Sequence, residues 1–301
     1  LAAPMGSSAP VKLLLGSSGQ LWTLTQGRVH YLEDWRKAML QGDSALAWKH
    51  LDLDFADFIA LGPHEDLWAI NQQGLIHFQE GEKKIYEAEH GLRQRQVRDF
   101  LITEDGSAWL ATSNGLGVLQ DGRLEWYLDG YREWSDLTSL EVAGADEVWV
   151  GTRSSGLFKF SRKGVLNYND SQNPIERHVF EISQGPGGNL WLATQNGLSR
   201  HRPRQLKVYT EANGLPKSPS YAIGIEPSSE RVWIGMSWKG PAYFDGQLIK
   251  TLPQTHPMAN AYIRSAGYTP EGGLWMGGNL GVSMVSEHAL DLLPKPSKLS
   301  M

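Results

Sequence analysis

A tryptophan and a lysine stand side by side in a short polar segment of this chain, Ser237 to Lys239. Trp238 lies outside the regular tryptophan pattern of the chain, in a stretch that reads as a loop. An exposed aromatic ring stacks on the apolar face of a sugar ring, while Lys239 and other donors bind the hydroxyl groups. The alternative is that Trp238 folds back and packs on the protein itself. We predict that Trp238 and Lys239 contact a ligand and keep packing as the alternative.

Further cationic and aromatic residues are candidates for the rest of such a site. They are Arg98, Trp134, Arg153, Tyr221, Tyr262 and Arg264. Guanidinium groups bind carboxylates through paired hydrogen bonds, and aromatic rings supply flat apolar contact area. This mixture suits a hydroxylated or carboxylated ligand better than an apolar one. The expected partner is therefore a polar small molecule or an oligosaccharide.

Two histidines give an alternative in which the site is catalytic. A general base must reach the proton that it abstracts, and His178 and His256 lie between repeats, where this is possible. Arg98 or Arg153 would then hold a carboxylate. The chain has no G-x-S-x-G, H-E-x-x-H or P-loop motif. Its nine histidines are scattered and it has no cysteine, so we expect no metal site and no cofactor.

The elements that position these residues follow from a repeat. Seven tryptophans stand 46, 41, 40, 42, 42 and 42 residues apart, at Trp22, Trp68, Trp109, Trp149, Trp191, Trp233 and Trp275. Each follows a turn-rich cluster, and each repeat holds four short β-like runs with no long helical period. A period of this length with four strands predicts an all-β fold, a seven-bladed β-propeller with four-stranded antiparallel blades. The recurring tryptophans are expected to fill the gaps between blades.

Loop lengths place the candidate residues at one mouth of the central channel. The interval from the tryptophan to the glycine that begins the following β-like run is seven residues in blades 4 and 6, to Gly156 and Gly240, and five or six elsewhere. The longer loops hold Arg153 and Trp238. The other candidates lie before or at the start of innermost strands, where alternate residues face the channel, so half of them are expected to point away. A short helical insertion is expected in blade 1 after an acidic cap at Asp34.

Composition limits the class of protein. The seven repeats occupy residues 11–293 as one domain, with an extension at 1–10 and a linker or tail at 294–301. The net charge is −5 and no basic cluster appears, so nucleic acid is not an expected partner. No run of eighteen apolar residues is present, and we expect no transmembrane segment within this chain.

The repeat resembles the two-component regulator propeller repeat. The pattern D-G-x-x-W-x-x-T-x-x-G-L is complete from Asp105 to Leu116. The linker typical of that family appears as Tyr-Thr-Glu-Ala-Asn-Gly-Leu-Pro at 209–216. The resemblance implies a periplasmic or extracellular sensing module of a bacterial signalling protein. Such modules report to a histidine kinase or a nucleotide cyclase, often in response to saccharides.

The repeat is also similar to that of the virginiamycin B lyases, a second seven-bladed family. Three functions therefore stay open. The first is a non-catalytic sensor that binds its ligand at the channel mouth. The second is a protein interaction scaffold, and the third is a lyase or hydrolase that uses His178 and His256. A sensor would also have a homodimer or a downstream signalling domain as a possible partner. We favour the first.

Overall fold

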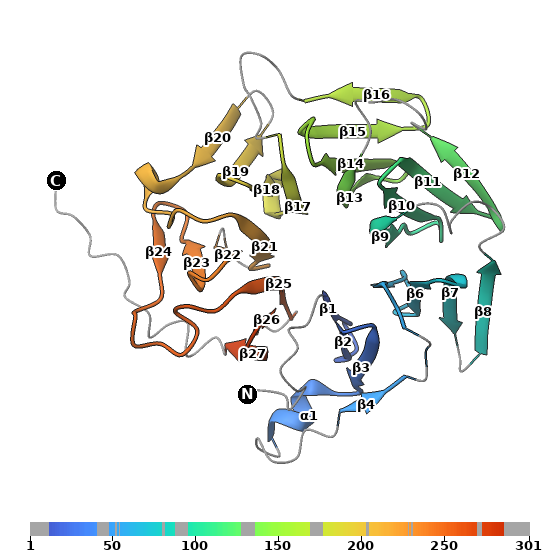
Figure 1. Ribbon diagram of the computed structural model, residues 1–301, viewed down its shortest axis with the longest axis horizontal. Coiled ribbons are helices and arrows are strands. Elements are labelled where there is room, and N and C mark those ends of the chain that lie inside the picture. The colour runs from blue at the N-terminus through green and yellow to red at the C-terminus, as the bar shows by residue number, and fades with distance from the viewer. Residues whose placement is uncertain are drawn as a thin grey trace.

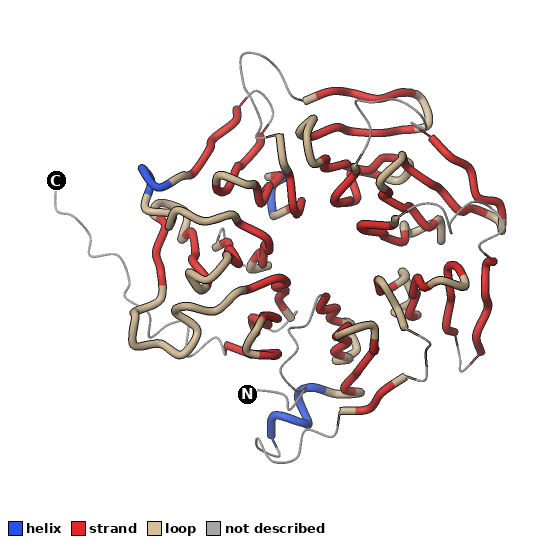
Figure 2. Tube along the Cα trace, viewed as in Figure 1, coloured by secondary structure: helices blue, strands red, loops and turns tan. Residues whose placement is uncertain are grey.

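Seven small antiparallel sheets are arranged around a central axis in the computed structural model (Figure 1). The structure describes residues 12–40, 48–51, 53, 55–79, 82–87, 96–127, 136–168, 177–202, 205–227, 229, 231–269 and 273–285. Strands make up nearly all of the regular structure in these residues (Figure 2). The predicted seven-bladed β-propeller is confirmed.

Within each blade the strands pair in chain order, from the innermost outward. Blade 1 contains β1 (Lys12–Leu15), β2 (Leu21–Thr25), β3 (Arg28–Leu32) and β4 (Lys49–His50). Blade 2 contains β5 (Phe58–Leu61), β6 (Leu67–Asn71), β7 (Gly74–Gln79) and β8 (Glu82–Glu87). Blade 3 contains β9 (Val97–Ile102), β10 (Ala108–Thr112), β11 (Gly115–Gln120) and β12 (Arg123–Tyr127). Blade 4 contains β13 (Leu137–Gly144), β14 (Glu147–Thr152), β15 (Leu157–Ser161) and β16 (Gly164–Asn167).

Blade 5 contains β17 (Val179–Gln184), β18 (Leu190–Thr194), β19 (Gly197–Arg202) and β20 (Gln205–Tyr209). Blade 6 contains β21 (Ser220–Ile225), β22 (Val232–Met236), β23 (Pro241–Phe244) and β24 (Ile249–Thr251). In blade 7 the described residues form β25 (Ile263–Tyr268), β26 (Leu274–Gly278) and β27 (Gly281–Val285). The helical elements in the described residues are α1 (Trp35–Leu40) and the short 3₁₀ turns η5 (Pro186–Gly188) and η6 (Glu211–Asn213).

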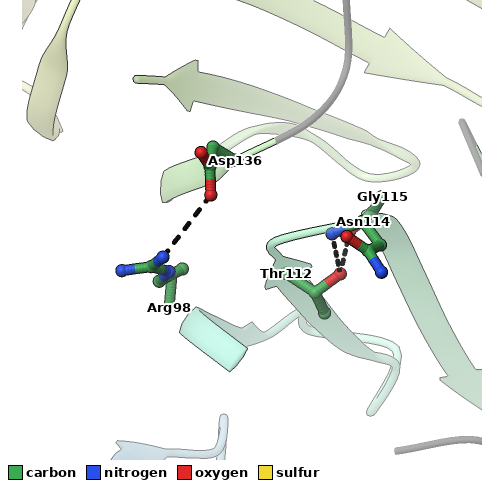
Figure 3. Close-up of polar contacts among 5 residues, drawn as sticks. All are labelled: Arg98, Thr112, Asn114, Gly115 and Asp136. Carbon is green, nitrogen blue, oxygen red and sulfur yellow. Dashed lines mark hydrogen bonds and ion pairs between the residues drawn. The ribbon is translucent and has the colours of Figure 1, made fainter. Parts of the chain in front are cut away.

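Threonine, glycine and aspartate side chains or conformations close the turns within a blade, and so keep the strands of each repeat at a regular spacing. In blade 3 the Thr112 hydroxyl donates to the Gly115 carbonyl at 2.7 Å and accepts the Asn114 N–H at 3.1 Å (Figure 3). This closes the turn between the second and third strands. At the opposite end, the Asp105 carboxylate accepts the Ser107 N–H at 3.0 Å, and Gly106 takes a φ of 79°, which suits glycine. Such side-chain bonds fix the turn and therefore the strand register.

The recurring tryptophans lie between neighbouring blades, as predicted. Trp109 of blade 3 is 1% exposed and packs with Leu140 and Val150 of blade 4. Trp68 of blade 2 packs in the same way with Phe100 of blade 3. Each sheet alone would leave both faces in water, and the tryptophans help to bury one of them against the next sheet.

The predicted insertion in blade 1 is the helix α1, and it helps to join the first and last blades. Asp34 Oδ1 accepts the N–H groups of Arg36 at 2.9 Å and Lys37 at 3.3 Å, which confirms the acidic cap. The buried Trp35 ring meets the Trp275 ring of blade 7 edge to face, with centroids 5.8 Å apart. The helix is thus part of the contact between blades 1 and 7.

We expect Asp34→Ala to lower the free energy of unfolding by about 1 kcal/mol, because two helix N–H groups lose their acceptor. Urea unfolding followed by tryptophan fluorescence measures this change. Asp146→Ala, at an exposed turn residue, is the matched control and should leave the free energy of unfolding unchanged. An equal effect of both substitutions would argue against the cap.

Candidate functional site

Bulges at the start of five innermost strands determine which side chains reach the channel mouth. In β9, for example, Val97 pairs with Thr112 and Asp99 pairs with Ala111, so Arg98 has no partner residue on β10. The same one-residue shift occurs in β13, β17, β21 and β25. The residues at the shift are Arg98, Thr138, Phe180, Tyr221 and Arg264. A bulge bends the strand and redirects a side chain, and bulges are common beside functional sites.

The bulges correct the simple alternation expected from the sequence. Arg98 reaches Asp136, while the next residue, Asp99, reaches Lys12 of β1. Two consecutive residues therefore both reach charged partners, whereas a regular strand would turn one of them away. The described residues of β1 and β5 pair with their neighbours without such a shift.

An unbroken row of five rings runs along the mouth from blade 5 to blade 7. Ring centroids lie 3.9 Å apart between His178 and Phe180, 4.5 Å between Phe180 and Tyr221, and 5.4 Å between Tyr221 and Tyr262. Trp238 completes the row, with its centroid 5.7 Å from that of Tyr262 and the two planes 21° apart. We call these five residues the aromatic row. Burial and the neighbouring Tyr262 raise the pKa of Tyr221, which keeps its hydroxyl neutral and able to donate.

Trp238 ends the row in an unusual position, because the residue is 60% exposed and its φ is 56°. A bulky residue rarely adopts a positive φ, since its Cβ crowds the backbone. Its loop is held by the Ser218 hydroxyl, which donates to the Ser237 carbonyl at 2.9 Å. At the other end a Cβ on Gly240 would lie 2.3 Å from the Met258 carbonyl oxygen, so only glycine fits there. The chain therefore holds a strained tryptophan with its ring toward solvent.

Cations lie at both ends of the aromatic row. At the Trp238 end, the Arg264 guanidinium lies 5.2 Å from the centre of the Tyr262 ring, and its Nε donates to the Tyr262 hydroxyl at 3.3 Å. Lys239 is exposed next to Trp238. At the His178 end, burial lowers the pKa of His178, and the nearby Arg153 guanidinium lowers it further. His178 is therefore held in its neutral form beside a permanent positive charge.

Backbone hydrogen bonds fix the His178 end of the mouth. The Asp136 N–H donates to Ser113 O at 2.9 Å, and the Arg153 N–H donates to Asp136 O at 3.0 Å. Asp136, with a φ of 58°, also pairs with Arg98 at 3.4 Å between Oδ1 and Nη2. Figure 3 shows the Arg98 side chain directed at Asp136. The loops of blades 3 and 4 are thus tied together where Arg98 and Arg153 emerge.

A second charged group joins the innermost strands, and we call it the channel cluster: Lys12, Asp99, Glu141 and Glu181. Lys12 Nζ lies 3.4 Å from Asp99 Oδ1. Each acid accepts an N–H from the innermost strand of the next blade: Leu140 to Asp99 at 2.9 Å, Gln184 to Glu141 at 3.2 Å, and Ile223 to Glu181 at 2.9 Å. Burial raises the pKa of Glu141 to about 7 and that of Glu181 to about 8. The cluster joins blades 3 to 6 through these hydrogen bonds, and its stability depends on the protonation of the two glutamates as well as on the Lys12–Asp99 ion pair.

The structure brings most of the sequence candidates together. Arg98, Arg153, Tyr221, Tyr262, Arg264, Trp238 and Lys239 all lie at the mouth, with His178 among them. Trp134 lies outside the described residues. The packing alternative for Trp238 holds only in part, because its ring stacks on Tyr262 and stays largely exposed.

His256 is not among the residues brought together. It lies in the loop between β24 and β25, where its Nδ1 accepts the Met258 N–H at 3.1 Å and its carbonyl accepts the Ala259 N–H at 2.9 Å. The described hydrogen bonds of His256 stay within that loop, so none of them brings it next to His178. Sequence reasoning missed Phe180, Asp136 and the channel cluster. Within the described residues, no group of three or more histidine, aspartate or glutamate side chains is placed to hold a metal ion.

Comparisons with known proteins support the fold. No family model matches the chain, and no curated protein sequence matches it. Among solved structures, the extracellular domain of the putative hybrid two-component system BT3049 from B. thetaiotaomicron is similar, with a TM-score of 0.76 and 16% identity. The extracellular domain of the putative one-component system BT4673 from the same organism gives 0.67 and 14%. This chain is covered to 97% and 94% by these matches but spans 41% and 39% of those two chains.

An enzyme has the same fold. A catalytically inactive variant of virginiamycin B lyase from Staphylococcus aureus, solved with quinupristin, has a TM-score of 0.71 and 12% identity. The match covers 94% of this chain and 96% of the lyase. At such identities the likeness concerns the fold alone. The part of the chain that the structure describes contains no helix of the length and apolarity that a membrane crossing requires.

Proposed function

We propose that this protein is a non-catalytic β-propeller that binds a saccharide or another polar small ligand at its channel mouth. The aromatic row carries the proposal, and above all Trp238, whose ring is held largely in water by a strained backbone. Strain of this kind persists where the surrounding structure enforces it, and it is common at ligand sites. A ligand that covers the ring removes its apolar area from water, which favours binding.

The polar groups around the row fit a hydroxylated ligand. Arg98, Arg153, Arg264 and Lys239 supply N–H donors, and the Tyr221 and Tyr262 hydroxyls both donate and accept. A small set of such groups around flat apolar surface is the usual composition of a ligand site. Among the described residues of the mouth, no hydrogen bond joins the His178 ring to a carboxylate that would orient it, so the same geometry favours binding over catalysis.

The proposed setting is an input domain outside the cytoplasm, in the periplasm or the extracellular space, of a bacterial signalling protein. Two similar structures are extracellular domains of signalling systems, and this chain matches only part of each. We propose that ligand binding at the mouth is relayed to a downstream signalling domain or to a second copy of the propeller.

A binding experiment with product analysis tests the proposal. The purified chain is screened by thermal shift against oligosaccharides, uronic acids and small carboxylates, and each hit is titrated by calorimetry. We expect saturable binding, with the ligand recovered intact by chromatography after long incubation. Recovery of altered ligand, or the absence of any binding by a folded protein, would contradict the proposal.

A lyase is the second candidate, and His178 is the observation that favours it. The imidazole is neutral, lies at the mouth and has Arg153 nearby to hold a carboxylate, as a general base for C–H abstraction requires. If screening does reveal turnover, His178→Ala should abolish it and His256→Ala should leave it unchanged. Turnover that survives His178→Ala would exclude this mechanism.

No observation favours the scaffold function in the same way. The exposed large apolar residues among those described are spread over different blades: Phe55, Ile85, Val142, Leu166, Trp238, Leu248 and Leu280. Single apolar residues on a surface are ordinary, whereas a docking surface is a contiguous patch.

A further inference from the structure

The mouth carries local positive charge on a protein whose net charge is −5. Arg98, Arg153, Arg264 and Lys239 lie there, and Asp136 pairs with Arg98. The acids of the channel cluster are compensated separately, by Lys12 and by the raised pKa of the two glutamates. Neither Arg153 nor Lys239 makes an ion pair with a described acidic residue. Cations of one sign gathered in a small region attract anions and orient them. The charge of the site therefore selects for a negatively charged ligand.

The row is also too long for a ligand with a single ring. Its five rings are joined by four successive contacts of 3.9 to 5.7 Å between centroids. Arg153, whose N–H donates to the Asp136 carbonyl at 3.0 Å, lies at the His178 end, and Arg264 and Lys239 lie beside Tyr262 and Trp238 at the other. A ligand that used both groups of cations would have to extend along the row.

The orientations of the rings indicate what kind of extended ligand fits. Successive ring planes differ by 34°, 54°, 81° and 21° from His178 to Trp238. A rigid planar molecule can stack on only one of these faces at a time. A chain of rings joined by rotatable bonds can follow these changes of plane and keep its charged groups at the edges.

We propose that the ligand is an acidic oligosaccharide that lies along the aromatic row, with carboxylates bound at Arg153 and at Arg264. This inference rests on the proposed function and specifies the charge and the length of the ligand. Each carboxylate accepts charge-assisted hydrogen bonds from a guanidinium group, and the sugar rings between them cover the aromatic faces. Binding that depends on these charges weakens as salt is added, because the ions screen the exposed groups.

The test uses ligands that differ in one property at a time. Tetragalacturonate and tetramannuronate are titrated by calorimetry beside the galacturonate monomer and the fully methyl-esterified tetragalacturonate, which keeps the rings and loses the charges. We expect at least one of the two acidic tetramers to bind. The monomer and the esterified tetramer should bind at least about tenfold more weakly, from the loss of ring contacts and of charged hydrogen bonds respectively.

One arginine variant checks the placement of the carboxylate. Arg153→Gln should lower the affinity for the acidic tetramer by about tenfold to a hundredfold. The weak affinity for the esterified tetramer should not change. Arg123→Gln, at an exposed arginine on the outermost strand β12, is the matched control and should change neither affinity. Circular dichroism and the melting temperature establish that both variants are folded.

The outcomes separate this inference from the proposed function. Equal affinity for the esterified and the acidic tetramer would overturn the part that concerns charge, and equal affinity for the monomer would overturn the part that concerns length. In both cases the proposed binding site would stand. Failure of both acidic tetramers to bind overturns the inference as a whole. If the wider ligand screen also yields no binding, the proposed function fails with it.

Discussion

The melting temperature of this protein should fall as the pH rises from about 5 to about 9, because the channel cluster holds protons that the unfolded chain releases. In the unfolded chain both glutamates lose their protons near the ordinary value of 4.5. In the folded protein the pKa of Glu141 is raised to about 7 and that of Glu181 to about 8, mainly by burial. The charged groups that face them are Lys12 of β1 and Asp99 of β9.

The sign follows from proton counting. Between the unfolded and the folded pKa values the native state binds more protons, so stability decreases as the pH rises. The contribution is complete below about pH 4.5 and is lost through about pH 7 to 8. Shifts of this size correspond to several kcal/mol, which lowers the melting temperature by roughly 5 °C or more.

A variant isolates this effect from the other groups that titrate in the same range. Glu181→Gln keeps a side-chain oxygen for the Ile223 N–H and removes the titration, so the decline in melting temperature should become shallower. Glu104→Gln, at an exposed turn of blade 3, is the control and should keep the wild-type slope. Differential scanning calorimetry across the pH range measures both. A slope in Glu181→Gln as steep as that of the wild type would show that the carboxyl is not the source.

Removal of the Trp238 ring should weaken ligand binding by at least about thirtyfold, because a tryptophan that a ligand covers is the type of residue that dominates binding energy. Trp238→Ala and Trp238→Gly should weaken it equally, since both delete the ring. The two variants should differ in stability. At a φ of 56° alanine keeps the backbone strain and glycine relieves it, so Trp238→Gly should be more stable than Trp238→Ala by about 1 kcal/mol.

Calorimetric titration gives the affinities, and urea unfolding gives the stabilities. Leu166→Ala is the matched control, because this residue of the outermost strand β16 is also 60% exposed and lies away from the mouth. It should leave binding unchanged. Wild-type affinity in both tryptophan variants would remove Trp238 from the site, and equal stability of the two would show that the backbone is not strained.

The fold could be predicted from the sequence because the residues that determine it recur in each repeat and act on near neighbours in the chain. The tryptophan period, the threonine that closes the turn before Gly115, and the Asp105 turn each recur or act within a few residues. Such features need no knowledge of the rest of the chain. The cap of α1 could be predicted from Asp34 for the same reason. The contact of Trp35 with Trp275 could not be predicted, because the two residues lie far apart in the sequence.

The candidate site was predicted in composition but not in arrangement. Large polar and aromatic residues in loops suggested Trp238, Arg153 and Tyr262. The bulges that redirect Arg98 and Phe180 have no characteristic residue type, so the sequence does not reveal them. Asp136 offered a weak signal, since a short acidic residue before a strand tolerates a positive φ. Glu181 accepts the N–H of Ile223, which lies more than forty positions away, so this bond can be recognised only in the folded structure.

The most direct test of the binding site is to observe Trp238 while a ligand binds. The protein is labelled with 5-fluorotryptophan, its ¹⁹F resonances are assigned with single tryptophan variants, and tetragalacturonate or the strongest hit of the ligand screen is titrated in. We predict that the Trp238 resonance shifts along the binding curve while those of the buried Trp109 and Trp233 stay in place. Calorimetric binding with no change at Trp238 would place the ligand elsewhere and contradict the assignment of the mouth as the binding site.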